Sequence, residues 1–154
     1  MIRAIGRLPE PWQKEAVHMY EERLAPFGGV DITELPEGHG GSSKPDEHKT
    51  RSVEANSLLK GVPEDAFLVA LDETGKSLSS VKLAEKLQDW SDDGRRTVAF
   101  VIGGSWGLDE RVRKKAGAIL SFGPMTLPHG IARVILLEQL YRAQMIRAGR
   151  EYHK

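Results

Sequence analysis

The chain has 154 residues, of which 40% are apolar and 29% charged, and its 22 basic side chains balance 22 acidic ones. This composition is typical of one folded domain and excludes a disordered protein. The lack of cysteine excludes a disulfide scaffold, an iron–sulfur cluster, a thiolate zinc site and a cysteine nucleophile. The apolar runs fall far short of the roughly 20 residues of a membrane helix, and no apolar signal core begins the chain. We therefore expect a cytoplasmic protein with no membrane partner.

The balanced charge conceals a polarity along the chain. Residues 1–110 hold 13 basic and 20 acidic side chains, whereas residues 111–154 hold 9 basic side chains and only two acidic ones. One interpretation is structural, because cations near the C-terminal ends of helices are favoured by the helix dipole. The other is a basic face that binds phosphates, with the acidic remainder limiting indiscriminate adhesion to RNA.

The first half of the chain alternates short apolar runs with helical patterns. We expect strands at residues 2–5 and 30–35, a helix at 12–24, an irregular loop at 36–45 and a helix at 46–60. The loop contains three glycines, which suits either a plain surface loop or a mobile loop near a ligand.

The second half continues the alternation, with continuous apolar runs of the kind found in strands buried on both faces. Its expected elements are a strand at 66–71, a helix at 81–90, a strand at 97–102, a helix at 109–116, a strand at 118–122 and a helix at 131–148. Five alternations of strand and helix predict a single α/β domain, with a mostly parallel sheet and helices on both faces.

The last helix is apolar around nearly its whole circumference. Its large apolar side chains are Ile131, Val134, Ile135, Leu136, Leu137, Leu140 and Tyr141. A helix of this kind must be buried on every side. It is either the central helix of the domain or, as we favour, a helix buried partly against a second subunit in a two-fold symmetric homodimer.

One candidate phosphate-binding motif fails on inspection. Gly75-Lys76-Ser77 follows a strand and precedes a helix, as a P-loop would, but the motif also needs a glycine where this chain has Ala70. Without the glycine-rich turn, the backbone offers no nest of N–H groups for a triphosphate. The segment is instead expected to form a turn, and ATP or GTP hydrolysis is disfavoured.

Two later segments are better candidates for a ligand site. Gly103-Gly104 directly follows a buried strand, where glycines let the backbone approach a flat ligand at the carboxyl edge of a sheet. Residues 122–129 form a loop with two prolines and several apolar side chains, which suits the wall of a pocket. Trp106 lies between these segments, and we expect it to pack rather than to stack on RNA. His18, His39 and His48 show no metal-ligand spacing, so no metal is expected.

Three motifs carry a resemblance over essentially the whole chain. They are Leu71-Asp72-x-x-Gly75-Lys76-x-x-Ser79-Ser80, Phe100-Val101-Ile102-Gly103-Gly104-x-x-Gly107-Leu108, and Met125-Thr126-Leu127-Pro128-His129-x-x-x-Arg133-Val134 running on to Tyr152-His153-Lys154. In order, spacing and total length the chain resembles the RlmH family of SPOUT RNA methyltransferases. Members of that family methylate N3 of a pseudouridine in 23S ribosomal RNA and use S-adenosyl-L-methionine as methyl donor.

The resemblance implies which residues bind the donor and which surround the target base. The donor would contact Leu71, Gly103, Gly104, Phe122, Gly123, Pro124, Met125, Thr126 and Leu127. The groups implied at the base are His129, Tyr152 and His153, with Arg133 and Arg142 on phosphate or carbonyl oxygens. None of these is singled out as the group that removes the N3 proton.

The resemblance also implies a trefoil knot, which ordinary topology rules would not predict. We expect a single SPOUT domain over residues 1–154, with the knotted, donor-binding half at about residues 66–154. The implied partners are a second copy of the chain and 23S ribosomal RNA within the assembled ribosome. Two alternatives stay open: a non-catalytic ribosome- or RNA-binding protein that retains the fold, and a small α/β enzyme with a nucleotide phosphate on Gly75-Lys76-Ser77.

Overall fold

The computed structural model describes residues 1–92 and 97–152, in which strands and helices alternate along the chain. The elements are β1 (Ile2–Ile5), α1 (Pro11–Leu24), the 3-10 helix η1 (Ala25–Phe27), β2 (Ile32–Leu35), α2 (Glu47–Lys60), β3 (Phe67–Ser77), α3 (Ser80–Asp92), β4 (Val98–Ile102), α4 (Glu110–Lys115), β5 (Ala118–Ser121) and α5 (His129–Arg147).

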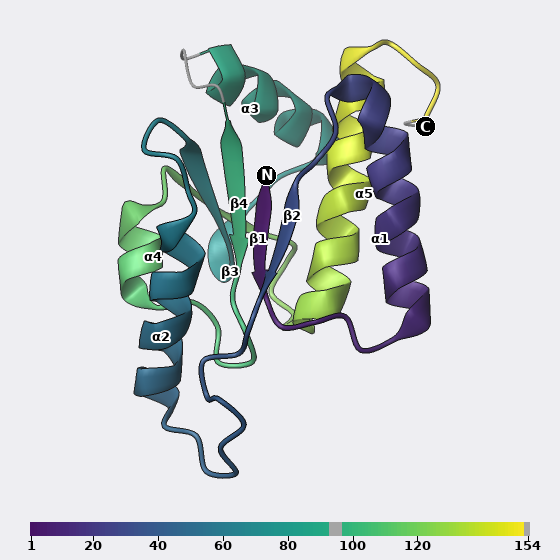
Figure 1. Ribbon diagram of the computed structural model, residues 1–154. Coiled ribbons are helices and arrows are strands. Elements are labelled where there is room, and N and C mark those ends of the chain that lie inside the picture. The colour runs from purple at the N-terminus through teal and green to yellow at the C-terminus, as the bar shows by residue number, and fades with distance from the viewer. Residues whose placement is uncertain (93–96, 153–154) are drawn as a thin grey trace.

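The five strands form one sheet in the order β2-β1-β4-β3-β5, and every neighbouring pair is parallel. Helices α1 and α5 lie side by side on one face of this sheet, and α2 and α4 lie on the other (Figure 1). The predicted fold class, a single α/β domain with a parallel sheet covered on both faces, is therefore confirmed.

The sheet separates two apolar layers because successive strand side chains point to opposite faces. On β4, Phe100 and Ile102 pack in the layer with α1, α3 and α5, while Ala99 and Val101 pack in the layer with α2 and α4. The strands are buried on both sides, which explains why their sequences are continuous apolar runs rather than alternating ones.

Strand β3 differs from its prediction. It was expected to end at Leu71, with a turn at Gly75-Lys76, but it continues to Ser77. Both Leu71 and Lys76 pair with Leu120 of β5, so residues 72–75 form a bulge within the strand. The turn prediction was wrong because the polar bulge looks like a chain reversal in sequence, while the strand resumes its pairing beyond it.

Gly75 is where the bulge returns to the sheet. A Cβ atom at this position would lie 2.7 Å from the backbone carbonyl atoms of Ile119. Only a residue without a side chain can approach the neighbouring strand so closely. Gly75, which had suggested a phosphate-binding loop, thus allows β3 to resume its pairing with β5.

The helix boundaries follow local capping. Asp46 caps α2 by accepting a hydrogen bond from the backbone N–H of Lys49 at 2.7 Å, and Asp109 caps α4 through the N–H of Arg111 at 2.8 Å. Helix α5 begins at His129, two residues before its expected start. Within the described residues, no helix is both long and apolar enough to cross a membrane.

Helix α5 packs against α1 and α3 in the larger apolar layer. Leu136, Leu137, Leu140 and Ala143 form its buried stripe. Ile131 and Ile135 lie elsewhere on the circumference and are only half-buried in the single chain. The fold therefore buries part of this helix fully and leaves part of its apolar surface accessible.

Candidate active site

A cavity of about 1040 Å³ lies at the carboxyl edge of β3, β4 and β5. Its walls come from the bulge within β3, from the turn at residues 103–108 that follows β4, and from the loop at residues 122–129 that follows β5. The carboxyl edge is where ligands bind in parallel α/β sheets. The two segments singled out in the sequence therefore meet around one space.

The structure brings together most residues that were expected to bind a methyl donor. Those that line the cavity are Leu71, Gly103, Gly104, Phe122, Gly123, Met125, Thr126 and Leu127. Pro124 lies in the same loop but is exposed and does not line the cavity. The walls combine apolar side chains with bare glycine backbone, which suits a ligand that is partly flat and apolar and partly polar.

The turn after β4 is held tightly by its glycines. The Gly107 N–H donates to the Gly104 carbonyl oxygen at 3.0 Å, and the two residues form an isolated β-bridge. A Cβ on Gly103 would lie 2.8 Å from the carbonyl carbon and oxygen of Gly107, and Gly107 has a φ of +73°. Side chains at Gly103 and Gly107 would therefore disrupt the turn.

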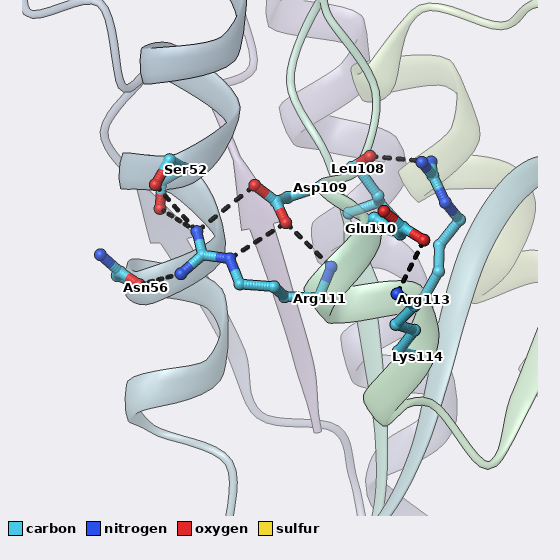
Figure 2. A network of polar contacts seen from close by, with 8 residues as sticks. All are labelled: Ser52, Asn56, Leu108, Asp109, Glu110, Arg111, Arg113 and Lys114. Atoms are coloured by element: carbon cyan, nitrogen blue, oxygen red, sulfur yellow. Dashed lines mark hydrogen bonds and ion pairs between the residues drawn. The ribbon is translucent and has the colours of Figure 1, made fainter.

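The segment after this turn is fixed to α2 by a polar network (Figure 2). The guanidinium of Arg111 donates to Asp109, to the hydroxyl and carbonyl oxygens of Ser52, and to the Asn56 side chain, at 2.9–3.3 Å. The hydrogen bonds from Arg111 lower the pKa of the Asp109 carboxyl, which keeps it charged and bound. The network connects the start of α4 to the helix across the layer.

A second arginine connects α4 to the β3 bulge. Arg113 donates to the Leu108 carbonyl oxygen at 2.8 Å and to the Asp72 carboxylate at 3.0 Å. Burial alone would raise the pKa of Asp72, but hydrogen bonds from Thr74 and Arg113 outweigh it and hold the pKa below its ordinary value. Asp72 is therefore an ionised anchor at the wall of the cavity.

The bulge also contacts the loop at residues 122–127. The Thr126 hydroxyl donates to the Glu73 carboxylate at 2.9 Å. Both residues are exposed and line the cavity. This hydrogen bond joins two walls that are 53 residues apart in the sequence.

A buried carboxyl that sequence analysis missed lies beneath the turn. Glu54 of α2 is 3% exposed; its Oε1 accepts a hydrogen bond from the Gly38 N–H at 3.0 Å, and its Oε2 finds no partner among the described residues. A Cβ on Gly104 would lie 2.9–3.0 Å from the two oxygens. Burial raises the pKa of Glu54, and the backbone groups of Gly38 and Gly104 offset this only in part. The sequence signal for its burial was that Glu54 lies one helical turn before the apolar Leu58, on the same face of the helix.

His129 and Arg133 lie one helical turn apart on α5, but only His129 reaches the cavity. His129 lines the cavity, and its Nε2 lies 3.4 Å from the Arg7 carbonyl oxygen. Arg133 is fully buried; it pairs with Glu34 at 2.5 Å and donates to the Gly6 carbonyl oxygen at 2.9 Å. The structure thus gives Arg133 partners within the fold, beneath the His129 turn.

The end of the described chain folds back onto the other end of α5. The Tyr152 ring packs edge-on against Tyr141 at 4.9 Å, and the Arg142 guanidinium lies 4.8 Å from its centre. Arg142 also pairs with Glu138 at 2.5 Å. His153 lies outside the described residues.

Tyr152 and Arg142 are consequently distant from His129 within one chain. Thirteen residues of helix separate His129 from Arg142, which corresponds to roughly 20 Å. The expected base-contacting residues therefore fall into two groups, one at each end of α5. Among the described residues, no cluster of three or more His, Asp or Glu side chains could hold a metal ion.

The fold and the cavity together define an α/β domain with a cavity where parallel α/β sheets bind their ligands. A family model described as "Predicted SPOUT methyltransferase" matches residues 1–153. The chain belongs to the SPOUT methyltransferase family.

Three relatives named ribosomal RNA large subunit methyltransferase H are similar over their whole length. The protein of Methylorubrum extorquens (strain PA1) is 42% identical, and the alignment covers 100% of this chain and 95% of the relative. The protein of Clostridium novyi is 41% identical, with 99% and 98% covered. The protein of Alkaliphilus oremlandii is 39% identical, also with 99% and 98% covered.

Proposed function

We propose that this chain is an S-adenosyl-L-methionine-dependent methyltransferase that methylates N3 of a pseudouridine in 23S ribosomal RNA. The observation that carries the proposal is the cavity in which eight of the nine expected donor-binding residues meet. The full-length similarity to relatives named as large-subunit rRNA methyltransferases supports the substrate class. The specific base and atom come from the resemblance to the RlmH family.

The residues present fit this methyl donor. Leu71, Phe122 and Leu127 provide apolar walls for an adenine ring, and the loop backbone between them offers donors and acceptors to the ring edge. Gly103 and Gly104 allow the ligand to approach the backbone closely. The bound donor supplies an electrophilic methyl group on a sulfonium.

The chain's own groups then have to position the base and handle one proton. N3 of a uracil-type ring holds its proton at neutral pH, so the attacking nitrogen must share or lose it. His129 lies at the rim of the cavity and is the described side chain best placed to contact this proton. Arg133 acts as a positioning residue, because it holds the Gly6 turn against which the His129 ring packs.

The second group, Arg142, Tyr152 and His153, requires a second subunit in this proposal. The two groups are separated by most of the length of α5, and Ile131 and Ile135 leave apolar surface on that helix. In a homodimer, the tail of one chain completes the site of the other. The proposal includes the knotted topology of the family, with the donor-binding half at about residues 66–154.

The assembled ribosome in the cytoplasm is the proposed substrate. The single α/β domain formed by these 154 residues offers little surface with which to bind a long free RNA. A preformed particle presents the target base already in place. The excess of basic residues after residue 110 would contact its phosphates.

Calorimetry with S-adenosylhomocysteine, with ATP as a control ligand, tests the donor site. We expect binding of S-adenosylhomocysteine only. Methyl transfer would then be measured on naked rRNA, isolated large subunits and whole ribosomes, with the modified base mapped by mass spectrometry. Transfer is expected on whole ribosomes and at N3 of a pseudouridine; equal rates on all three substrates would refute the ribosome assignment.

Single substitutions test the base-contacting residues. H129A, Y152F and H153A should each lower methyl transfer by about 10²-fold or more if the residue contributes to proton handling. Unchanged transfer in all three would overturn the assignment. The alternative, a non-catalytic RNA-binding protein, predicts ribosome binding without any affinity for S-adenosylhomocysteine.

A further inference from the structure

Trp106 is a large aromatic side chain displayed at the mouth of the cavity. It is 41% exposed and lines the cavity. The sequence predicts that this side chain packs, but the structure leaves its ring partly exposed. Exposed apolar side chains that gather at one cavity are typical of a binding surface, and Met125 is a second one at this cavity.

The backbone that carries Trp106 is fixed on both sides. Before it, Gly104 is bridged to Gly107 and leaves no room for a side chain above Glu54. After it, Leu108 is buried and its carbonyl oxygen accepts a hydrogen bond from Arg113. The Arg111 network then anchors the next residues to α2 (Figure 2). The ring is therefore presented from a rigid turn.

The surroundings of Trp106 suit a nucleic acid. Met125, which is 74% exposed, lines the same cavity from the loop at residues 122–127 and adds a second apolar contact. Arg51 of α2 also lines the cavity and pairs with Glu47 at 3.1 Å. Aromatic rings and cations on the walls of one groove are what proteins use to hold unstacked bases and their phosphates.

We propose that Trp106 is a stacking platform for a base of the RNA substrate next to the target nucleotide. This inference rests on the proposed function. Stacking on a ring that is already held in position costs little conformational entropy, so the contact with Trp106 adds directly to the affinity for the RNA. Trp106 is thus a specificity-determining residue that holds the substrate and leaves the donor site unaffected.

The test compares W106A and W106F with the wild-type chain on whole ribosomes. W106A should raise KM for the ribosome about 5-fold to 100-fold. W106F, which keeps a flat ring, should recover most of the affinity. The Kd for S-adenosylhomocysteine should stay within about 2-fold in both variants. V81A, at an exposed apolar position on α3, is the matched control and should change neither quantity.

Three results would overturn the stacking role. They are an unchanged KM in W106A, a weaker affinity for S-adenosylhomocysteine with the ribosome KM unchanged, or a change in the mass of the W106A particle in light scattering. The second would make Trp106 a wall of the donor site, and the third an interface residue. If the wild-type chain neither binds S-adenosylhomocysteine nor methylates ribosomes, the proposed function fails instead.

Discussion

Glu54 shows how a single carboxyl group can support a ligand-binding turn from below. Its buried oxygens lie against Gly104, whose neighbours form the floor of the cavity, while the Gly38 N–H holds one of them from the glycine-rich loop. A side chain on Gly104 would displace this carboxyl. Gly104 must therefore lack a side chain, because the buried carboxyl of Glu54 occupies the space that a side chain would need.

The buried position of Glu54 makes stability depend on pH. Burial raises the pKa of Glu54 from 4.5, so its contribution to stability is full below pH 4.5 and is lost as the pH rises through the folded-state pKa. The neutral amide introduced by the substitution E54Q cannot ionise. The free energy of unfolding of E54Q relative to wild type should therefore increase as the pH rises above 4.5 in urea titrations.

A matched variant with the opposite sign provides the control. The hydrogen bond from Lys114 lowers the pKa of exposed Glu110, so that pair contributes stability above pH 4.5 and loses it in acid. E110Q should lose stability relative to wild type as the pH rises towards 4.5 and keep a constant difference above it, whereas E54Q gains stability only above pH 4.5. Parallel curves for the two variants would contradict the assignment of the neutral form to buried Glu54.

Arg133 has different partners from those that its position in the sequence suggests. The chain places it one helical turn after His129, which suggested a shared role at the substrate. Its actual partners, Glu34 and the Gly6 carbonyl oxygen, are 99 and 127 residues away. Spacing along a helix indicates a shared face, but not whether that face meets a ligand or another part of the fold.

At the scale of elements, the bulge in β3 supplies the polar side chains of one wall of the cavity. It displays Asp72, Glu73 and Thr74 while the strand pairs with β5 on both sides of it. Arg113 holds one end of this segment, and Thr126 contacts its middle. The cavity is thus bounded by the bulge, a tight turn and a loop; the bulge is hydrogen-bonded directly to the loop and, through Arg113, to the turn.

Replacing Gly75 should damage both the bulge and the cavity. In G75A the added methyl group would contact the Ile119 backbone, which cannot move without breaking β5. We expect a loss of about 1–3 kcal/mol in the free energy of unfolding, together with weaker binding of S-adenosylhomocysteine. S77A, at an exposed position of the same strand, is the control and should leave both unchanged. A fully stable G75A would mean that the bulge is not constrained there.

The sequence predicted the elements well and their irregularities poorly. Strand β1 and most of β4 coincide with the expected ranges because buried parallel strands have local, continuous apolar runs. The bulge at residues 72–75 was not predicted, because the pairing around it depends on β5, which lies far along the chain. Eight of the nine residues named through the resemblance line one cavity, and their binding of a methyl donor stays a prediction. The contacts of Glu54 and Arg133 are long-range and have no local signature.

At the scale of the whole molecule, α5 is the element that should join two chains. We expect I135D to place a charge in the proposed subunit interface and convert a dimer to a monomer in light scattering, because an uncompensated charge at such a contact is costly. V53D makes the same kind of change at an exposed position of α2 and should remain dimeric. A wild-type chain with the mass of one subunit would contradict the dimer itself.

The strand order also constrains how the molecule is made. Strand β4 joins the pair β2-β1 to the pair β3-β5, since Phe100 lies between Ile2 and Val69 in the sheet. A nascent chain that has not yet produced residues 98–102 therefore contains the β1-β2 pair and an unpaired β3, because both neighbours of β3, β4 and β5, come later in the chain. Folding must wait until about two thirds of the chain has been synthesised, and the open edges of β1 and β3 stay available for incorrect pairing until then.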